Sequence, residues 1–455
     1  MIDTKSITHC GIDFGTTNSS LAIVIDGKPT VIPIDRQNTN PKVLKSLIYI
    51  NPQQECAIGQ HAINRYLGDL KQLPSVPLRQ EFTGRFIKTF GPSTGGGAGP
   101  VIFVPEIVEI DDSGRGRLLQ SLKSVLTSST FTGTTIFGQF YSLEALLTLL
   151  LKEIKTRAET EIGYELTSAV IGRPVKYVGT SENEIALERM KITSKNAGFK
   201  QIEFEYEPVG AALDYGLTSS SPQNILVYDF GGGTLDICIM ELPSRKILSV
   251  SGRGLGGDLL DSHLAIAKIA PHFGLNSIIN GKMPFPKYLS ATFSSWYLAT
   301  LLKTIKNHDT LENLCLKSNQ PDLVRNLITL IFHDYGFEFF QSIDQSKISL
   351  STSPFTTFLF KRPDLNIQET ISESDFITAI ALDLETSNDC INDALHLASL
   401  KSSDIDRVIL TGGSSQIPVF IAQIKTIFGS DKIITSDHFT SVASGLALRA
   451  EQLFR

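Results

Sequence analysis

A short segment that occurs twice constrains the fold of this chain more than any other feature. "GIDFGTTNSS" begins at Gly11 and "VYDFGGGTLD" begins at Val227, so Asp-Phe-Gly starts at Asp13 and again at Asp229. Each copy follows a short apolar run and precedes another, the pattern of a strand, a tight loop and a second strand. The copies are separated by about half of the 455 residues. This spacing indicates two similar halves and is too long for a solenoid repeat.

The segments around both copies predict a mixed α/β protein. A chain of this length is too long for one compact core. Asp26-Gly27 is a typical hairpin turn after the first copy. A long apolar helix is expected after the N-cap residue Ser142, and another helical pattern runs from about 375 to 400. Strands that alternate with helices predict an α/β fold with sheets covered on both faces.

Composition excludes several classes of partner. The formal net charge of −6 provides no basic field for nucleic acid or anionic lipid. The apolar run "LEALLTLLLKEI" is too short to span a bilayer, and the N-terminus lacks a signal peptide's apolar core. Five scattered cysteines without a Cys-x-x-Cys pair suit a reducing compartment. We expect a cytoplasmic protein that binds neither nucleic acid nor membranes.

The repeated loops have the chemistry of a phosphate site. Loops rich in glycine and threonine let backbone N–H groups converge on an anion, because no Cβ blocks the approach. A carboxylate at a strand end, such as Asp13 or Asp229, can hold hydrated Mg²⁺ or orient a water molecule. Thr16, Thr17 and Thr234 add hydroxyl groups. Either copy alone is equally compatible with a plain hairpin turn; two copies favour a pair of phosphate loops.

Three further segments are candidates for the same site. "LTGGSSQIP", from Leu410 to Pro418, is a strand-to-helix loop that suits an anion or a nucleotide, although an ordinary turn has the same pattern. Glu207 lies where a strand meets a helix of small residues, and can either position water or cap the helix. "GRGLGG", from Gly252 to Gly257, fits a dinucleotide motif, but no acidic residue ends a following strand as that fold requires.

These motifs, in this order, resemble the actin, hexokinase and heat shock protein 70 ATPase superfamily. "IDFGTTNS", "YDFGGGTLDI", "YEPVGAALDYG", "GLGGDLLD" and "LTGGSSQIP" are most similar to the nucleotide-binding domain of heat shock protein 70 (DnaK) chaperones. "AVIGRPVKYVG" and "SVASGLALRAEQLFR" further resemble the DnaK-like YegD branch. The likeness runs from about residue 7 to the end and is weakest at about 60–120 and 270–335.

The resemblance implies a two-lobed, actin-like ATPase fold in which each lobe is a duplicated ribonuclease-H-like mixed sheet flanked by helices, with a nucleotide cleft between the lobes. Lobe I would span 1–205, and lobe II would span 206–430 with a helical subdomain at about 258–365. A C-terminal helix in 431–455 would return to lobe I. Chaperones of this family continue into a peptide-binding domain, whereas this sequence ends at Arg455, so we expect no such domain here.

The resemblance also assigns residues to ATP or ADP and to Mg²⁺. Asp13 and Asp229 would hold the metal through water, Glu207 would position that water shell, and Thr234 would join them as a catalytic residue. Asp236 would support the second loop, and Pro174 resembles a switch proline that relays the nucleotide state. The residues expected to contact the nucleotide are Gly15, Thr16, Thr17, Asn18, Gly231, Gly232, Gly233, Gly256, Gly257, Asp344, Lys347, Ser351, Gly412, Gly413 and Ser414.

A catalytic lysine near the γ-phosphate is also implied, since positive charge stabilises phosphoryl transfer. Two segments compete for it. "RFIKTFG" offers Lys88 and "LLQSLKSVL" offers Lys123. We favour Lys123, because its surroundings resemble the closer branch. Ile348 and Gln416 stand where the family has adenine-stacking arginines, which puts strict preference for ATP in question.

The function expected from the sequence is an ATP-binding, slowly hydrolysing, chaperone-like protein with possible client or co-chaperone partners. Three alternatives remain open: an actin-like polymer-forming ATPase, a small-molecule kinase of the same fold, and a nucleotide sensor without turnover. No acceptor-site motif for a kinase is distinct in the sequence.

Overall fold

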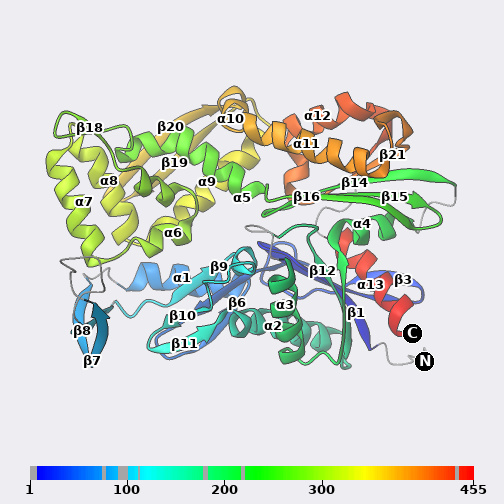
Figure 1. Cartoon of the computed structure of the whole chain (residues 1–455), viewed down its shortest axis with the longest axis horizontal. Helices are drawn as coiled ribbons and strands as arrows, with labels where there is room; N and C mark the ends of the chain where they lie inside the picture. Colours follow the sequence, from blue (N-terminus) through cyan, green and yellow to red (C-terminus); the bar gives the residue numbers. More distant parts are fainter. Residues whose placement is uncertain are drawn as a thin grey trace.

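Two large mixed sheets form the framework of the protein (Figure 1). The computed structural model describes residues 8–73, 78–90, 101–110, 113–177, 183–216, 221–435 and 440–455. The first sheet has the strand order β3-β2-β1-β12-β13. Its strands are β1 (His9–Phe14), β2 (Asn18–Ile25), β3 (Lys28–Val31), β12 (Ser168–Arg173) and β13 (Gln201–Tyr206), with β4 (Leu44–Lys45) paired to β2.

The second sheet repeats the topology of the first. Its order is β16-β15-β14-β21-β22. The strands are β14 (Gln223–Phe230), β15 (Leu235–Leu242), β16 (Lys246–Arg253), β21 (Arg407–Thr411) and β22 (Ile433–Thr435). In each sheet three antiparallel strands follow one another in sequence, and two parallel strands are added beside the first of them. The duplicated motif in the sequence therefore corresponds to a duplicated sheet, and the expected mixed α/β fold is confirmed.

Helices cover both sheets because side chains alternate between the two faces of a strand. Leu226, Tyr228 and Phe230 on β14 pack in the outer core, where the Phe230 and Phe420 rings are 4.9 Å apart. Ile225 lies in the core on the opposite face. The covering helices are α2 (Leu143–Ile162) and α3 (Asn183–Asn196) on the first half, and α11 (Ala381–Ala398) and α12 (Pro418–Phe428) on the second. The short helix α10 (Glu373–Ala379) precedes α11 and packs on β20 (Leu365–Ser372) and α5 (Gly257–Leu264).

Two helices of small residues, α4 (Glu207–Gly216) and α13 (Ser441–Phe454), cross between the two sheets (Figure 1). They approach so closely that a Cβ on Gly445 would overlap the backbone carbonyl of Gly210. Gly11 on β1 is pressed against the backbone of α13 in the same way. Glycine and alanine in these helices therefore let residues of both halves pack in one apolar cluster.

Smaller elements extend each half away from the large sheets. The first half carries a three-stranded sheet, two hairpins and one helix: β5 (Leu47–Ile50), β6 (Cys56–Ile58), α1 (Gln60–Gln72), β7 (Arg79–Phe90), β8 (Val101–Ile110), β9 (Arg117–Gln120), β10 (Gly133–Ile136) and β11 (Gln139–Ser142). The second half carries α5 (Gly257–Leu264), β17 (Ile278–Ile279), β18 (Met283–Pro284), α6 (Trp296–Leu301), α7 (Ile305–Lys317), α8 (Pro321–Phe332), α9 (Gly336–Leu350), β19 (Phe355–Arg362) and β20 (Leu365–Ser372).

These extensions meet across the molecule. Trp296 Nε1 donates to Gln120 Oε1 at 2.6 Å, and Arg115 pairs with Asp334 at 2.9 Å with both side chains largely buried. Tyr66 and Phe337 pack edge to face in a small apolar cluster between them. The two halves are thus joined at α4 and α13 and again where these extensions touch.

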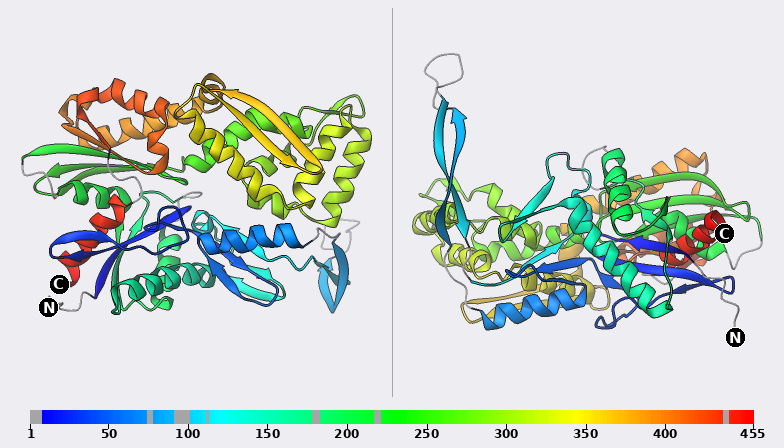
Figure 2. Two further views of the ribbon diagram at one scale, coloured as in Figure 1. Left: turned by 180° about the vertical axis from the view of Figure 1, so that it is seen from behind. Right: turned by 90° about the horizontal axis from the view of Figure 1, so that it is seen from below.

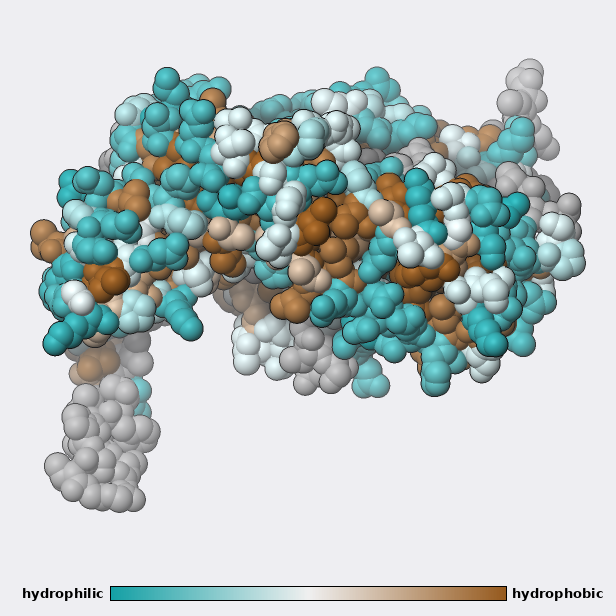
Figure 3. Space-filling view, turned by 90° about the horizontal axis from the view of Figure 1, so that it is seen from above, coloured by the Kyte–Doolittle hydropathy of each residue, from teal (hydrophilic) through white to brown (hydrophobic). Residues whose placement is uncertain are grey.

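The surface is mixed in character. Seen from above, hydrophilic residues dominate the outline of the body and hydrophobic residues show between them (Figure 3). No helix in the described ranges is long and apolar enough to cross a bilayer.

Several local expectations from the sequence are met. Asp26 and Gly27, both with positive φ, form the two-residue turn between β2 and β3. The Ser142 hydroxyl accepts a hydrogen bond from the Ala145 N–H and caps α2. The helical pattern from about 375 to 400 is divided at Ile380, which separates α10 from α11.

Candidate functional site

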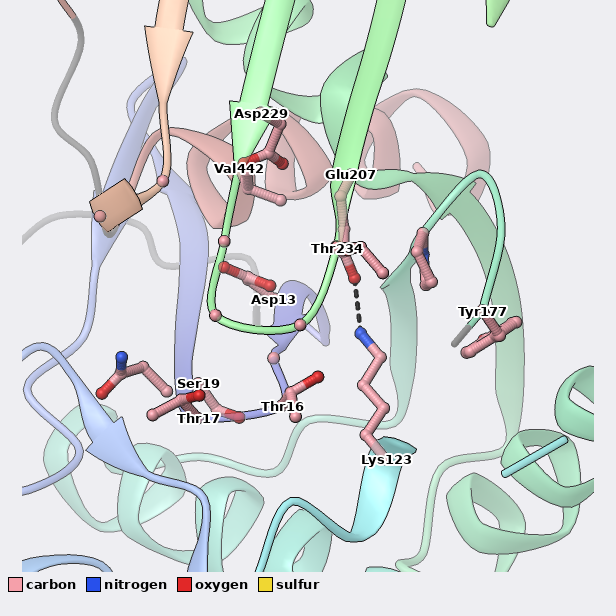
Figure 4. A pocket seen from close by; sticks show the side chains of 18 residues that line it. Asp13, Thr16, Thr17, Ser19, Lys123, Tyr177, Glu207, Asp229, Thr234 and Val442 are labelled. Atoms are coloured by element: carbon pink, nitrogen blue, oxygen red, sulfur yellow. Dashed lines mark hydrogen bonds and ion pairs between the residues drawn. The ribbon is translucent and has the colours of Figure 1, made fainter. Parts of the chain in front are cut away.

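A cavity of about 100 Å³ lies where the turn after β1 faces the turn after β14 (Figure 4). It is lined by Asp13, Gly15, Thr16, Thr17, Asn18, Ser19, Lys123, Pro174, Tyr177, Glu207, Asp229, Gly231, Gly232, Gly233, Thr234, Gly412, Gly413 and Val442. Most of the residues expected at a phosphate site from the sequence therefore surround one cavity, with contributions from both halves.

The first loop is fixed by the segment that follows β4. The Ser46 hydroxyl donates to the Gly15 carbonyl at 2.9 Å, and the Ser46 N–H donates to the Thr17 carbonyl at 2.9 Å. The Ser19 and Ser46 hydroxyl groups are 3.0 Å apart. These bonds use carbonyl groups of the loop and leave the Thr16 and Thr17 side chains facing the second loop.

The second loop is fixed by the start of α5 and by the turn after β21. Gly257 N–H donates to Gly231 O at 3.0 Å, and Asp258 N–H donates to Gly232 O at 2.9 Å. The Ser414 hydroxyl also donates to Gly231 O, at 2.9 Å. Gly256, Gly257 and Ser414, three of the residues expected to contact the nucleotide, therefore stand behind this loop and outside the lining of the cavity.

Glycine is needed where the two loops approach each other. A Cβ on Gly232 would lie 2.5 Å from Thr17 Oγ1, and a Cβ on Gly233 would lie 2.9 Å from Thr16 Oγ1. Gly412 has a φ of +80° and lies against the Phe230 carbonyl, a conformation that favours glycine. A side chain on the second loop would consequently displace the first.

Buried charge is concentrated at one end of the cavity. Lys123, from the short 3₁₀ helix Leu122–Val125, extends toward Glu207 at the start of α4, and their charged atoms are 2.6 Å apart (Figure 4). The Lys123 and Glu207 side chains are 7% and 12% exposed. Asp13 and Asp229 lie on the opposing strand ends beside this pair. Three carboxylates thus face one ammonium group.

The competing lysine, Lys88, lies elsewhere. It is exposed on β7, in a hairpin that projects from the body, and it does not line the cavity. The geometry therefore brings Lys123, and not Lys88, to the residues of the two loops.

The pKa values of the buried carboxyl groups reflect this crowding. Burial and the neighbouring Glu207 raise the pKa of Asp13 to about 7, although Lys123 opposes the shift. The same causes raise the pKa of Asp229 well above its usual value. Burial alone would lower the pKa of Lys123, but Glu207 and Tyr177 raise it overall. The cavity thus favours an added cation, which would let these carboxyl groups ionise.

Asp236 connects the second loop to the segment that contains Pro174. Its carboxylate accepts from the Val175 N–H at 2.8 Å and from the Thr234 side chain. Burial, followed by the charge of Glu207, raises the pKa of Asp236 to about 7. A single side chain thus holds Pro174 and Thr234 in register on the two sides of the cavity.

Asp344, Lys347 and Ser351 lie on α9 or at its end, beyond the cavity. Lys347 Nζ is 2.8 Å from Asp261 and 3.1 Å from Asp344, and it donates to the Gly257 carbonyl at 3.3 Å. Lys347 therefore links α9 to the glycine turn behind the second loop. Ile348 is half exposed on the same helix, and the Gln416 amide donates to the Ser415 hydroxyl.

A second cavity of about 170 Å³ adjoins the first and shares Thr17 with it. Asp258, Asp261 and Asp344 line one part of it, and Trp296 lies among the apolar residues of its wall. Asp261 Oδ1 is buried there and has no hydrogen-bond partner among the described residues. Burial raises the pKa of Asp258 to about 6 and that of Asp261 to about 7.

Sequence reasoning missed several residues of the site. Ser46 braces the first loop, Tyr177 lines the cavity beside Lys123, and Val442 of α13 closes one side. Tyr177 follows Pro174 closely and could have been noted for that reason. Ser46 and Val442 carry no local signal, because their roles depend on strand pairing and helix packing.

Comparison with known families supports the fold. The sequence profile described as "Hsp70 protein" matches residues 120–280 and 339–454. These ranges include Lys123, Glu207, the second loop and the turn at Gly412. The finer likeness to the YegD branch stays a prediction.

Curated relatives of similar sequence are named as DnaK chaperone proteins. The chain is 25% identical to a chaperone protein dnaK of Cyanidioschyzon merolae over 97% of its length, covering 61% of that relative. It is 26% identical to a chaperone protein DnaK of Mycoplasmopsis pulmonis, over 96% of this chain and 57% of that relative. It is 27% identical to a chaperone protein dnaK of Gracilaria tenuistipitata, over 97% of this chain and 59% of that relative. The chain thus spans about six-tenths of the length of these proteins. With the profile matching more than half of its residues, the chain belongs to the Hsp70 protein family.

Proposed function

We propose that this protein binds ATP or ADP with Mg²⁺ in the first cavity and hydrolyses ATP slowly. The observation that carries the proposal is the meeting of the two Asp-Phe-Gly loops, one from each duplicated sheet, around a cavity that also holds a buried lysine and three carboxylates. Family membership adds the expectation of nucleotide binding. Client and co-chaperone interactions are part of the same proposal, because relatives are named as chaperones.

The residues present fit a phosphate chain. Thr17 Oγ1 is buried and has no hydrogen-bond partner in the described ranges, which leaves a hydroxyl group available to a ligand. The second loop has no side chain at Gly232 or Gly233, where a Cβ would meet Thr17 or Thr16 of the first loop. Threonine hydroxyl groups and loop N–H groups are the donors that bind phosphate oxygens. Gly15, Thr16, Thr17, Asn18, Gly231, Gly232, Gly233 and Thr234 would form this cradle.

The residues also fit a metal ion held through water. No group of three or more metal-ligating side chains is close enough to hold an ion directly in the described part of the chain. Asp13 and Asp229 line the cavity and have raised pKa values. A bound cation would let them ionise, and the carboxylates would then accept hydrogen bonds from metal-bound water. A bound magnesium ion supplies positive charge that neutralises phosphate oxygens.

The mechanism we infer uses position and charge. Glu207 accepts a hydrogen bond from Lys123 at 2.6 Å, which fixes the ammonium group beside the cradle. From there the ammonium stabilises negative charge that develops on the transferred phosphoryl group. Glu207 and Asp13 orient the attacking water molecule by accepting its hydrogen bonds. Asp236 accepts a hydrogen bond from the Val175 N–H, next to Pro174, so a change in the second loop would reach Pro174.

One observation favours a second candidate, a small-molecule kinase of the same fold. The second cavity adjoins the first at Thr17 and contains Asp258 and Asp261, whose raised pKa values suit a general base near neutral pH. A hydroxyl-bearing substrate there would lie close to the phosphate cradle. ADP formation that increases on addition of one sugar or polyol from a panel would support this candidate; a rate independent of all of them would exclude those substrates.

The direct test of the main proposal is Mg²⁺-dependent ATP binding and single-turnover hydrolysis, comparing the wild type with Asp229→Ala. We expect tight binding and slow hydrolysis in the wild type and loss of hydrolysis in the variant. Absence of binding would overturn the proposal. Binding without turnover would instead identify a nucleotide sensor.

A further inference from the structure

The hairpin of β7 and β8 forms a separate arm on the first half. Its two strands pair only with each other in the described part of the chain. The arm projects away from the body (Figure 2). A two-stranded sheet is marginally stable alone, and three or more strands with an apolar face are usually needed. The arm therefore has the structure of an incomplete sheet.

One face of this arm is apolar and exposed. Pairing places Phe82 opposite Ile107, and Lys88 opposite Phe103, while the Phe82 and Phe86 rings are 5.4 Å apart. Phe82, Phe86, Phe103 and Ile107 are 48%, 60%, 65% and 53% exposed. Taking a typical area for each side chain, they present about 400 Å² of apolar surface. Patches of this size on a soluble protein are often binding sites.

The size of the patch indicates the kind of partner. A stable dimer buries roughly 800 Å² on each subunit, about twice what this face offers, so pairing of two copies through the arm is disfavoured. An extended strand of six or seven residues is about 20 Å long. That length matches β7 from Phe82 to Lys88. Lys88, exposed beside Phe103, would attract an acidic residue at one end of such a strand.

We propose that the β7–β8 arm binds one extended segment of another polypeptide, which adds to the arm as a third strand. The free edge of the arm supplies backbone hydrogen bonds. Added beside β7, the segment places apolar side chains at alternate positions against Phe82 and Phe86, which continue the apolar face formed with Phe103 and Ile107. An acidic residue of the segment pairs with Lys88. This surface is separate from the nucleotide cavity and does not depend on the function proposed for it.

The test uses the full-length protein and a labelled ten-residue peptide with valine at alternate positions and a glutamate at one end. Binding is measured by fluorescence anisotropy. We expect Phe86→Ser with Phe103→Ser to weaken binding at least tenfold. The matched control is Phe355→Ser with Leu359→Ser, since these residues are equally exposed on the β19–β20 hairpin, and it should bind normally.

Because the double variant could unfold the arm, a charge reversal provides an independent measurement. Lys88→Glu should weaken binding of the glutamate peptide and restore binding of a peptide with lysine at that position. A peptide with proline at alternate positions, which lacks the N–H donors, should not bind. The proposal is overturned if the proline peptide binds equally, if charge reversal has no effect, or if sedimentation shows a dimer that Phe86→Ser with Phe103→Ser dissociates.

Discussion

Replacing Lys123 with methionine tests the chemistry of the cavity most specifically. Methionine keeps most of the length of the side chain and removes its charge. The ammonium lies 2.6 Å from Glu207, and both side chains are nearly buried. Removing one partner of such a pair typically costs 3–5 kcal/mol of stability. Asp13 and Asp236 have pKa values near 7, so they can take up protons and relieve the excess charge. We therefore expect Lys123→Met to lower the free energy of unfolding by about 3 kcal/mol or less.

The effect on hydrolysis should be larger than the effect on binding. Loss of one group that stabilises developing charge lowers a rate by roughly 10²–10³, or about 3–4 kcal/mol of transition-state stabilisation. The assay is single-turnover hydrolysis of radiolabelled ATP with enzyme in excess, alongside urea denaturation to measure the free energy of unfolding. The same assay on Lys88→Met should give the wild-type rate. A wild-type rate in Lys123→Met would refute the reasoning, and a slow Lys88→Met would move the catalytic lysine to the arm.

Three further predictions concern stability. Gly445→Ala places a Cβ against the Gly210 carbonyl, and the packing cost should exceed the gain in helix propensity. We expect urea denaturation to show a free energy of unfolding lower by about 2 kcal/mol. An unchanged denaturation midpoint would contradict the close packing of α4 and α13. Asp383 raises the pKa of His263, so this pair stabilises the fold below pH 6.5 and loses its contribution, about 0.5 kcal/mol, as pH rises through the raised pKa. His263→Gln should remove that pH dependence of the melting temperature. If the pH dependence persists in the variant, another titrating group causes it. Ser142→Ala removes the cap of α2 and should lower the free energy of unfolding by about 1 kcal/mol in urea denaturation. An unchanged free energy of unfolding would contradict a stabilising cap.

The phosphate loops and the lysine of the site differ in how far the sequence predicts them. The loops at Asp13 and Asp229 are recognisable because glycine, threonine and flanking apolar runs are local signals. The duplicated sheet follows from the same repeat. Lys123 could not be chosen over Lys88 with certainty from local sequence, since its partner Glu207 is 84 residues away and only the packing of the first half brings them together.

The elements that sequence reasoning missed depend on contacts between distant segments. The apolar runs in β7 and β8 would ordinarily indicate buried strands, yet Phe82, Phe86 and Phe103 are exposed. The close crossing of α4 and α13 requires glycine on both helices. The sequence of one helix does not indicate that the other helix is its partner. Lys347 was expected at the nucleoside, while its bonds to Asp261 and Gly257 also tie α9 to the second loop.

The central claim is that the two Asp-Phe-Gly loops hold the phosphates of one nucleotide. Calorimetric titration of the wild type and of Gly232→Val with ADP and Mg²⁺ tests it most directly. A valine side chain at 232 would occupy the space beside Thr17 Oγ1, which lies 2.5 Å from a Cβ at that position. We predict one nucleotide per chain in the wild type and at least a hundredfold weaker binding in a folded variant. Equal binding by the two proteins would show that the nucleotide, if bound, lies outside these loops.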